Sequence, residues 1–126
     1  MKILVVDDEK LLVKGVKFNL ENEGYEVTAA YDGAAAVELA KKENFDLIVM
    51  DVMMPEINGL EATRAIRAHS RPDAASIPIV AMTADAFSED VRHALDAGMN
   101  AHIAKPVDIE KLIQTILRFL PQTTGA

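Results

Sequence analysis

Short apolar runs and longer amphipathic segments alternate along the whole chain. Most of the apolar runs are continuous and rich in branched aliphatic side chains, as in Leu47-Ile48-Val49-Met50, which is the pattern of a strand buried on both faces. The runs that predict strands are residues 3–6, 25–30, 47–50, 79–82 and 101–104. Between and after them apolar residues return every three or four positions, which predicts helices. The predicted helices cover about residues 12–20, 36–42, 60–68, 88–98 and 108–120.

Turn-forming and capping residues separate these elements. Asp32-Gly33 is typical of a turn, Asn58-Gly59 predicts an interruption between the third strand and the third helix, and the polar residues 70–76 predict a loop. Ser88 and Asp108 each stand just before a helical pattern and can cap it, because their side-chain oxygens accept hydrogen bonds from free backbone N–H groups.

The alternation of strands and helices predicts an α/β fold with one parallel sheet. Parallel strands buried on both faces require helices on both sides of the sheet. Right-handed crossovers leave few topologies, and we expect a single doubly wound five-stranded sheet in the order 2-1-3-4-5 with five helices. In such sheets the functional crevice lies beyond the carboxyl ends of the strands.

Composition narrows the classes of function. The 126 residues carry a formal charge of −7, which disfavours direct nucleic-acid binding, and the absence of Cys excludes thiol chemistry, disulfides and Cys-based metal sites. No apolar run approaches the roughly 20 residues of a membrane helix, and the N-terminus lacks a signal-peptide pattern. We expect one cytoplasmic domain over residues 1–120, followed by a frayed tail at 121–126.

Chemically useful side chains follow four of the five predicted strands. Asp7-Asp8 follows the first, Asp51 the third, Thr83 the fourth and Lys105 the fifth. In a 2-1-3 order the first and third strands are neighbours, so three carboxylates would meet and would need a cation. Oxygen-only ligands suit Mg²⁺, and an ammonium and a hydroxyl nearby could contact an anion held on that metal. The set therefore indicates phosphoryl transfer to an aspartyl nucleophile.

Each residue also has a plain structural interpretation. Asp7-Asp8 could cap the following helix, Thr83 could make a local hydrogen bond, and Lys105 could lie on the surface. The functional interpretation depends on their convergence at one edge of the sheet.

Other classes of function fit less well. A haloacid-dehalogenase phosphatase needs a second Asp where this chain has Met53, and no Gly-rich phosphate loop follows Gly33. The three histidines, His69, His93 and His102, lack zinc-ligand spacing. A pure interaction module without phosphorylation remains a second hypothesis, although this chain has every acidic residue and the lysine of the set described above.

Over residues 1–120 the chain resembles the response-regulator receiver domains of two-component signalling. The residues that carry the resemblance are 5–9, 47–55, Gly59, 82–84, Gly98 and Lys105-Pro106. The resemblance implies a flavodoxin-like fold and a phosphorylatable signalling domain, not an enzyme, that assists its own phosphorylation and dephosphorylation. It implies a histidine kinase or histidine phosphotransfer protein as phosphodonor, an output domain or target protein downstream, and a monomer or weak dimer.

The resemblance also implies roles for individual residues. Asp51 would be the phosphoacceptor. Mg²⁺ would be held by Asp8 and Asp51, by Asp7 directly or through water, and by the backbone carbonyl of Met53. Lys105 would pair with the phosphoryl oxygens, and the Lys105–Pro106 peptide would be cis.

The last implied role is a switch that runs from the strand-end hydroxyl of Thr83 to the ring at position 102, and changes the face made by the fourth helix, the fifth strand and the last helix.

Several positions depart from the common pattern of the family. His102 stands where Tyr or Phe is usual, so it is either the switch residue or a surface residue on an edge strand. Met53 and Asp85 flank the site, and Met53 has no polar group to orient water, which predicts slow self-hydrolysis. The N-terminal half resembles receivers linked to winged-helix domains, and residues 98–106 resemble receivers of hybrid kinases. A stand-alone regulator, an excised receiver and an engineered hybrid all stay open.

Overall fold

The computed structural model describes residues 1–54, 56–69, 76–84 and 89–120, and within them five strands alternate with five helices. The strands are β1 (Lys2–Val6), β2 (Glu26–Ala30), β3 (Leu47–Asp51), β4 (Ile79–Thr83) and β5 (Ala101–Ala104). The helices are α1 (Lys10–Asn22), α2 (Gly33–Lys42), α3 (Gly59–Arg67), α4 (Glu89–Ala97) and α5 (Ile109–Phe119).

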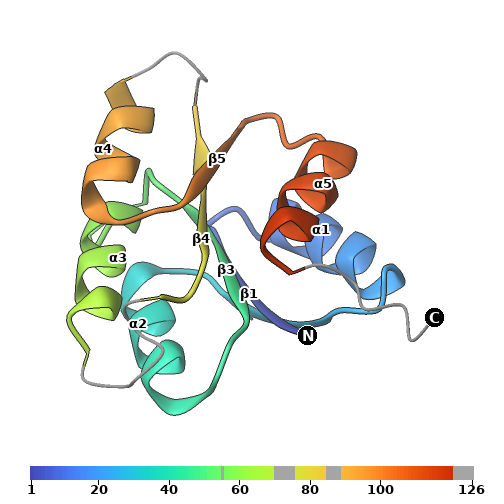
Figure 1. Ribbon diagram of the computed structural model, residues 1–126, viewed down its shortest axis with the longest axis horizontal. Helices are drawn as coiled ribbons and strands as arrows, with labels where there is room; N and C mark the ends of the chain where they lie inside the picture. The colour runs from blue at the N-terminus through green and yellow to red at the C-terminus, as the bar shows by residue number, and fades with distance from the viewer. Residues whose placement is uncertain (55, 70–75, 85–88, 121–126) are drawn as a thin grey trace.

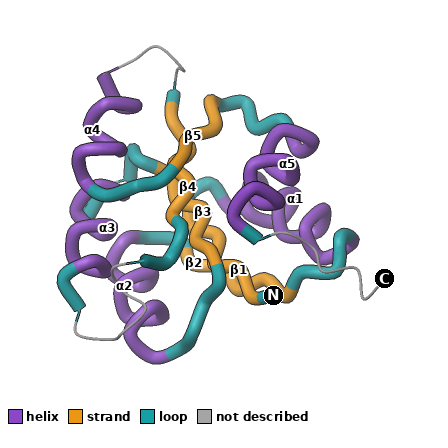
Figure 2. Tube along the Cα trace, in the orientation of Figure 1, coloured by secondary structure: helices purple, strands orange, loops and turns teal. Residues whose placement is uncertain are grey.

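The strands form one parallel sheet in the order β2-β1-β3-β4-β5, which confirms the predicted topology. Figure 1 shows α1 and α5 on one side of the sheet and α2, α3 and α4 on the other. The tube in Figure 2 shows the strands as a central layer between these two groups of helices. The alternation of side chains along β1 explains both layers: Leu4 and Val6 pack toward one group, and Ile3 and Val5 toward the other. The doubly wound α/β fold is therefore built on two apolar cores that share one sheet.

Helix starts differ from the predictions at two places. Asp32-Gly33 was predicted as a turn, but Asp32 is the N-cap of α2 and its side chain accepts a hydrogen bond from Ala35 N at 2.7 Å. Asn58 was likewise predicted only to interrupt the regular structure, but it is the N-cap of α3 and forms a reciprocal capping box with Glu61. Aspartate and asparagine before glycine suit a turn and a helix cap equally well, and only the following residues decide between them. Asp108 caps α5 as predicted.

Some predictions lie wholly or partly outside the described residues. These are the polar loop at 70–76, the cap at Ser88, the flanking Asp85, and the tail at 121–126. The domain boundary at residue 120 stays a prediction. In the part of the chain that the structure describes, each helix is too short or too polar to cross a lipid bilayer.

Arg67, at the end of α3, connects this helix to the residues before β4 and to the residues between α4 and β5. Its guanidinium donates hydrogen bonds to the carbonyl oxygen of Ile77 (2.6 Å), to that of Gly98 (2.8 and 3.1 Å) and to Asn100 Oδ1 (2.8 Å). Asn100 Oδ1 also accepts a hydrogen bond from Ile79 N at 2.9 Å. The last turn of α4 has no basic residue, so Arg67 supplies from α3 the cation that favours a helix C-terminus.

Replacing Arg67 with Met should lower the free energy of unfolding by about 2–3 kcal/mol, because it leaves several partly buried acceptors without donors. Urea unfolding monitored by circular dichroism measures the loss. The matched control is Arg64→Met, which changes an exposed arginine of the same helix and should shift the stability by no more than about 0.5 kcal/mol. Equal effects of the two substitutions would contradict the role of Arg67.

Candidate functional site

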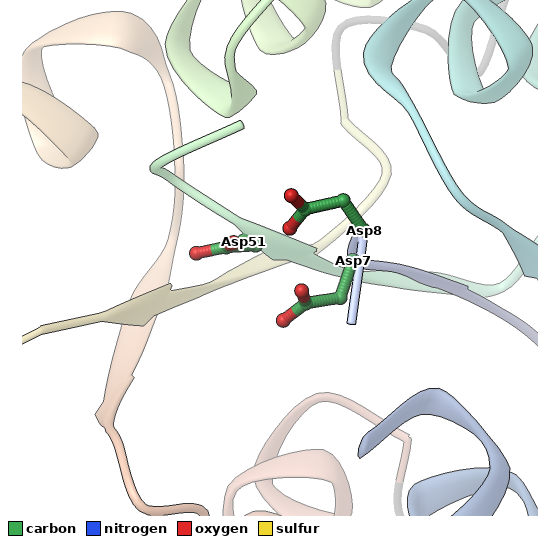
Figure 3. A group of neighbouring side chains, drawn as sticks. All are labelled: Asp7, Asp8 and Asp51. Atoms are coloured by element: carbon green, nitrogen blue, oxygen red, sulfur yellow. The ribbon is translucent and has the colours of Figure 1, made fainter. Parts of the chain in front are cut away.

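Three aspartates meet at the carboxyl edge of the sheet. Asp7 and Asp8 directly follow β1, Asp51 is the last residue of β3, and their oxygen atoms lie within 4.8 Å of one another. Figure 3 shows the three carboxylates gathered at this edge. The pairing of β1 with β3 brings together residues that are far apart in sequence. Asp7 is fully buried, Asp51 is nearly so, and Asp8 is exposed.

Lys105 faces the two buried carboxylates from the end of β5. Its Nζ lies 3.0 Å from Asp7 Oδ2, 3.3 Å from Asp51 Oδ2 and 4.0 Å from Glu9 Oε2. The Lys105–Pro106 peptide is cis, as the family resemblance implied. One ammonium among several carboxylates leaves an excess of negative charge at this edge.

Thr83 is the last residue of β4, next to β3 in the sheet. Its side chain is fully buried, and its Oγ1 has no hydrogen-bond partner among the described residues. Buried hydroxyls normally have partners, so an unpartnered one at this edge is consistent with a group that bonds to a ligand. Asp51 and Thr83 were predicted to follow their strands, but both belong to them, because Asp51 pairs with Met82 and Thr83 with Ala104.

Burial and neighbouring charges shift the pKa values of Asp51 and Lys105. Burial raises the pKa of the Asp51 carboxyl from 3.8 to about 6, and the negative charge of Asp7 adds to the rise. The Lys105 ammonium and the N–H of Met53, which donates to Asp51 Oδ1 at 3.2 Å, act in the opposite direction. For Lys105, burial acts to lower the pKa, but the hydrogen bonds and charges of Asp7 and Asp51 outweigh it and raise the pKa above its usual 10.5.

This set of donors fits a hard divalent cation. Asp7, Asp8 and Asp51 offer carboxylate oxygens close enough to share one ion, and no nitrogen or sulfur ligand is among them. Burial and the like charge of Asp7 both raise the pKa of Asp51, and a bound cation would offset them by favouring the charged carboxylate. Mg²⁺ fits this chemistry best, because it takes few carboxylates and keeps open positions for water or phosphate oxygens.

The alternative interpretation of Asp7-Asp8 as a helix cap is wrong. The N-cap of α1 is Glu9, without a capping hydrogen bond from its side chain. Asp7 Oδ1 instead accepts from the backbone N–H of Glu9 at 2.9 Å, which orients the carboxylate beside the helix start.

His102 lies apart from the acidic cluster. It is half-buried on β5, an edge strand of the sheet, where it pairs with Ala81. It lines a groove with Ile103 of the same strand and with residues of α5 that include Lys111, Thr115 and Arg118. The structure thus places it on an edge strand, and its role in a switch stays a prediction.

Two residues had no assigned role in the sequence interpretation. Glu9 comes within 4.0 Å of Lys105, and the only sequence signal for it was the third acid in the run Asp7-Asp8-Glu9. Gly59 was part of the motif without a stated reason, and a Cβ on it would lie only 2.1 Å from the carbonyl oxygen of Asp51. Glycine is therefore required beside the acidic cluster for space.

The sheet and its edge define a flavodoxin-like α/β domain with a cluster of three aspartates and a lysine at the carboxyl ends of its strands. The chain belongs to the response regulator receiver domains, whose family model matches residues 3–117. Domains of this family are phosphorylated signalling domains of two-component systems; they bind Mg²⁺ at an acidic pocket and interact with histidine kinases.

Similar proteins include a response regulator and a sensor protein. Response regulator ArlR of Staphylococcus saprophyticus is 41% identical over 124 residues, which cover 96% of this chain and 54% of ArlR. Sensor protein GacS of Pseudomonas syringae is 40% identical over 119 residues, 94% of this chain and 13% of GacS. The chain thus spans about half the length of ArlR and a small part of GacS.

Solved structures agree with these relatives. The receiver domain of sensor histidine kinase PA1611 from Pseudomonas aeruginosa has a TM-score of 0.87 and 36% identity, over 96% of this chain and 98% of that one. That structure has a magnesium ion coordinated in its active-site cleft. Chemotaxis protein CheY4 of Vibrio cholerae has a TM-score of 0.87 and 34% identity, over 94% and 97% of the two chains.

Proposed function

We propose that this chain receives a phosphoryl group on Asp51 in a Mg²⁺-dependent reaction. The observation that carries the proposal is the cluster of Asp7, Asp8 and Asp51 with Lys105 Nζ at 3.0 and 3.3 Å from the two buried carboxylates. It joins a nucleophile, a cation site and an ammonium at one edge of the sheet. Burying charged side chains is costly, and a cluster of buried charges at a strand edge is typical of a site that binds a ligand.

The chain's own residues would then divide the work of the transfer. A carboxylate oxygen of Asp51 attacks phosphorus, and the new P–O bond forms as the P–N bond to the donor imidazole breaks. The imidazole departs as a neutral ring, because it enters protonated on its other nitrogen. Lys105 moves its ion pairing from the carboxylates to a phosphoryl oxygen, and the unpartnered Thr83 hydroxyl donates to another.

Mg²⁺ would be held by Asp8 and Asp51, by Asp7 directly or through water, and by the carbonyl of Met53, and it would neutralise charge on the phosphoryl oxygens. Met53 is 63% exposed and offers no polar side-chain group to an attacking water, which supports slow hydrolysis of the product. The phosphoryl group ends on the chain itself, so the domain acts as a signalling element that assists its own phosphorylation and dephosphorylation.

The phosphodonor would be a histidine kinase or a histidine phosphotransfer protein. Exposed apolar side chains on α1 support a docking surface beside the site, with Leu11 85% and Phe18 64% exposed. A groove between α1 and residues 105–109 continues this surface up to Lys105. A donor seated there would bring its histidine to the acidic edge.

Incubation with Mg²⁺ and a small phosphodonor such as phosphoramidate should add one phosphoryl group, detected by intact mass. Asp51→Asn should abolish the adduct, because the amide is not a nucleophile at this site. The control Asp96→Asn changes an exposed aspartate on α4 and should leave the adduct unchanged. An unaltered adduct on Asp51→Asn would refute the assignment.

Phosphorylation would be transmitted to the face made by α4, β5 and α5. Thr83 ends β4, and pairing of β4 with β5 connects it to the strand that carries His102. Movement of the Thr83 hydroxyl toward the phosphoryl group would leave space behind it for rearrangement of this face. Amide chemical shifts on phosphorylation should therefore change in β5, α4 and α5, and changes confined to α1 and α2 would contradict the proposal.

A further inference from the structure

Gly33, the first residue of α2, lies against the chain that follows Asp51. A Cβ atom on Gly33 would stand 2.3 Å from the carbonyl oxygen of Ile57 and 2.8 Å from its Cγ2. Real Cβ atoms essentially never come within 3.0 Å of such atoms, and the closest atom belongs to the backbone, so no side-chain rotation relieves the contact. Since α2 and α3 also pack together, a side chain at Gly33 must push Ile57 away from α2.

Three residues, 57–59, carry this contact to the phosphoacceptor. Asn58 caps α3, and Gly59 is the first residue of that helix. A Cβ on Gly59 would lie 2.1 Å from the carbonyl oxygen of Asp51, and Gly59 N donates to the carbonyl oxygen of Val52 at 3.0 Å. The backbone of Asp51 is thus separated from the first turn of α2 by one short segment in close contact at both ends.

We propose that Gly33 is a positioning residue for the cation site, acting through residues 57–59 on the backbone around Asp51. The inference rests on the proposed function, since it assigns Gly33 to the geometry of the same site. Gly33 has no left-handed φ, so its backbone does not require glycine. Helix propensity alone favours alanine over glycine, and the reason for glycine at this position is the space that Ile57 occupies.

The experiment measures the dissociation constant of Mg²⁺ by calorimetry, with the metal alone as the probe. Gly33→Ala should weaken Mg²⁺ binding at least about 10-fold, as is typical when residues that orient metal ligands are changed. Circular dichroism should show that the fold is retained. The matched control is Gly15→Ala, also a helical glycine, where a Cβ meets nothing within 4 Å, and its Mg²⁺ affinity should equal that of the wild type.

A double-mutant cycle with Ile57→Gly tests whether Gly33 acts through Ile57. Ile57→Gly loosens the backbone of residues 57–59 and should therefore weaken Mg²⁺ binding by itself. It also removes Cβ and Cγ2 and lets the carbonyl oxygen of residue 57 turn away from residue 33, so adding Gly33→Ala to it should cost far less than the same substitution costs in the wild type. Unchanged affinity in Gly33→Ala, an equal loss in Gly15→Ala, or additive effects with Ile57→Gly would each overturn the inference.

Two further outcomes remain decisive. If Gly33→Ala does not fold, Ile57→Gly decides alone, and an unchanged affinity for Mg²⁺ overturns the inference. Failure of the wild-type chain to bind Mg²⁺ would instead refute the proposed function.

Discussion

Replacing Asp51 with Asn is expected to raise the free energy of unfolding of the metal-free protein by about 3 kcal/mol at pH 7. The wild-type protein holds the Asp51 carboxylate in a buried position beside the like charge of Asp7, and asparagine removes that charge with little change in volume. Lys105 keeps an ion pair in the variant, because its Nζ also lies 3.0 Å from Asp7 Oδ2. Asp51, the proposed phosphoacceptor, is therefore predicted to be a site where function is maintained at the expense of stability.

The pH dependence of this difference has a definite sign. The pKa of Asp51 is about 6 in the folded protein and 3.8 as its ordinary value, so the folded state binds the proton more tightly than the unfolded state. Below pH 3.8 the carboxyl is protonated in both states and contributes no difference. As the pH rises from about 4 to about 6, the unfolded state ionises first, and the folded protein loses stability. Above pH 6 the loss is complete and constant.

Urea unfolding in excess chelator, at intervals from pH 4 to pH 8, measures this difference. Wild type and Asp51→Asn should have similar stability near pH 4 and diverge up to pH 6, whereas Asp96→Asn, on the exposed surface of α4, should follow the wild type throughout. Mg²⁺ should reduce the difference, because it stabilises the folded wild type by mass action. A difference that does not vary with pH would contradict the buried-charge explanation.

Replacing Asp8 with Ala should weaken Mg²⁺ binding by about 100-fold or more and abolish phosphorylation at ordinary metal concentrations. Asp8 is the exposed member of the acidic cluster, so its removal leaves the apolar cores intact and relieves like-charge repulsion. Calorimetry with Mg²⁺ and intact mass after phosphodonor treatment measure the two losses, and thermal unfolding should show a fold at least as stable as wild type.

The control for Asp8→Ala is Asp96→Ala, which removes an exposed carboxylate far from the cluster in sequence and should change neither measurement. Normal phosphorylation of Asp8→Ala, or of the wild type in excess chelator, would contradict the metal requirement.

The fold was predictable because strand and helix periodicities are local properties. The run at 47–50 is buried at every position in the structure, as its continuous apolar character predicted. Exact boundaries were less predictable, since β3 and β4 extend through the polar residues Asp51 and Thr83. A strand continues as long as its neighbour offers backbone partners, whatever the polarity of the side chain.

The sequence by itself determined the alternation of strands and helices and the residues that stand near the strand ends, because these follow from hydrophobic periodicity. It limited the sheet order to a few topologies, and the expected order 2-1-3-4-5 is the one that the structure has. Only the tertiary structure decided how those residues differ. Asp7 and Asp8 are adjacent in sequence, yet one is buried against Lys105 and the other exposed. The raised pKa of Asp51 and the need for glycine at Gly33 depend on segments distant in sequence, since burial, charge and close backbone contact are properties of the packed chain.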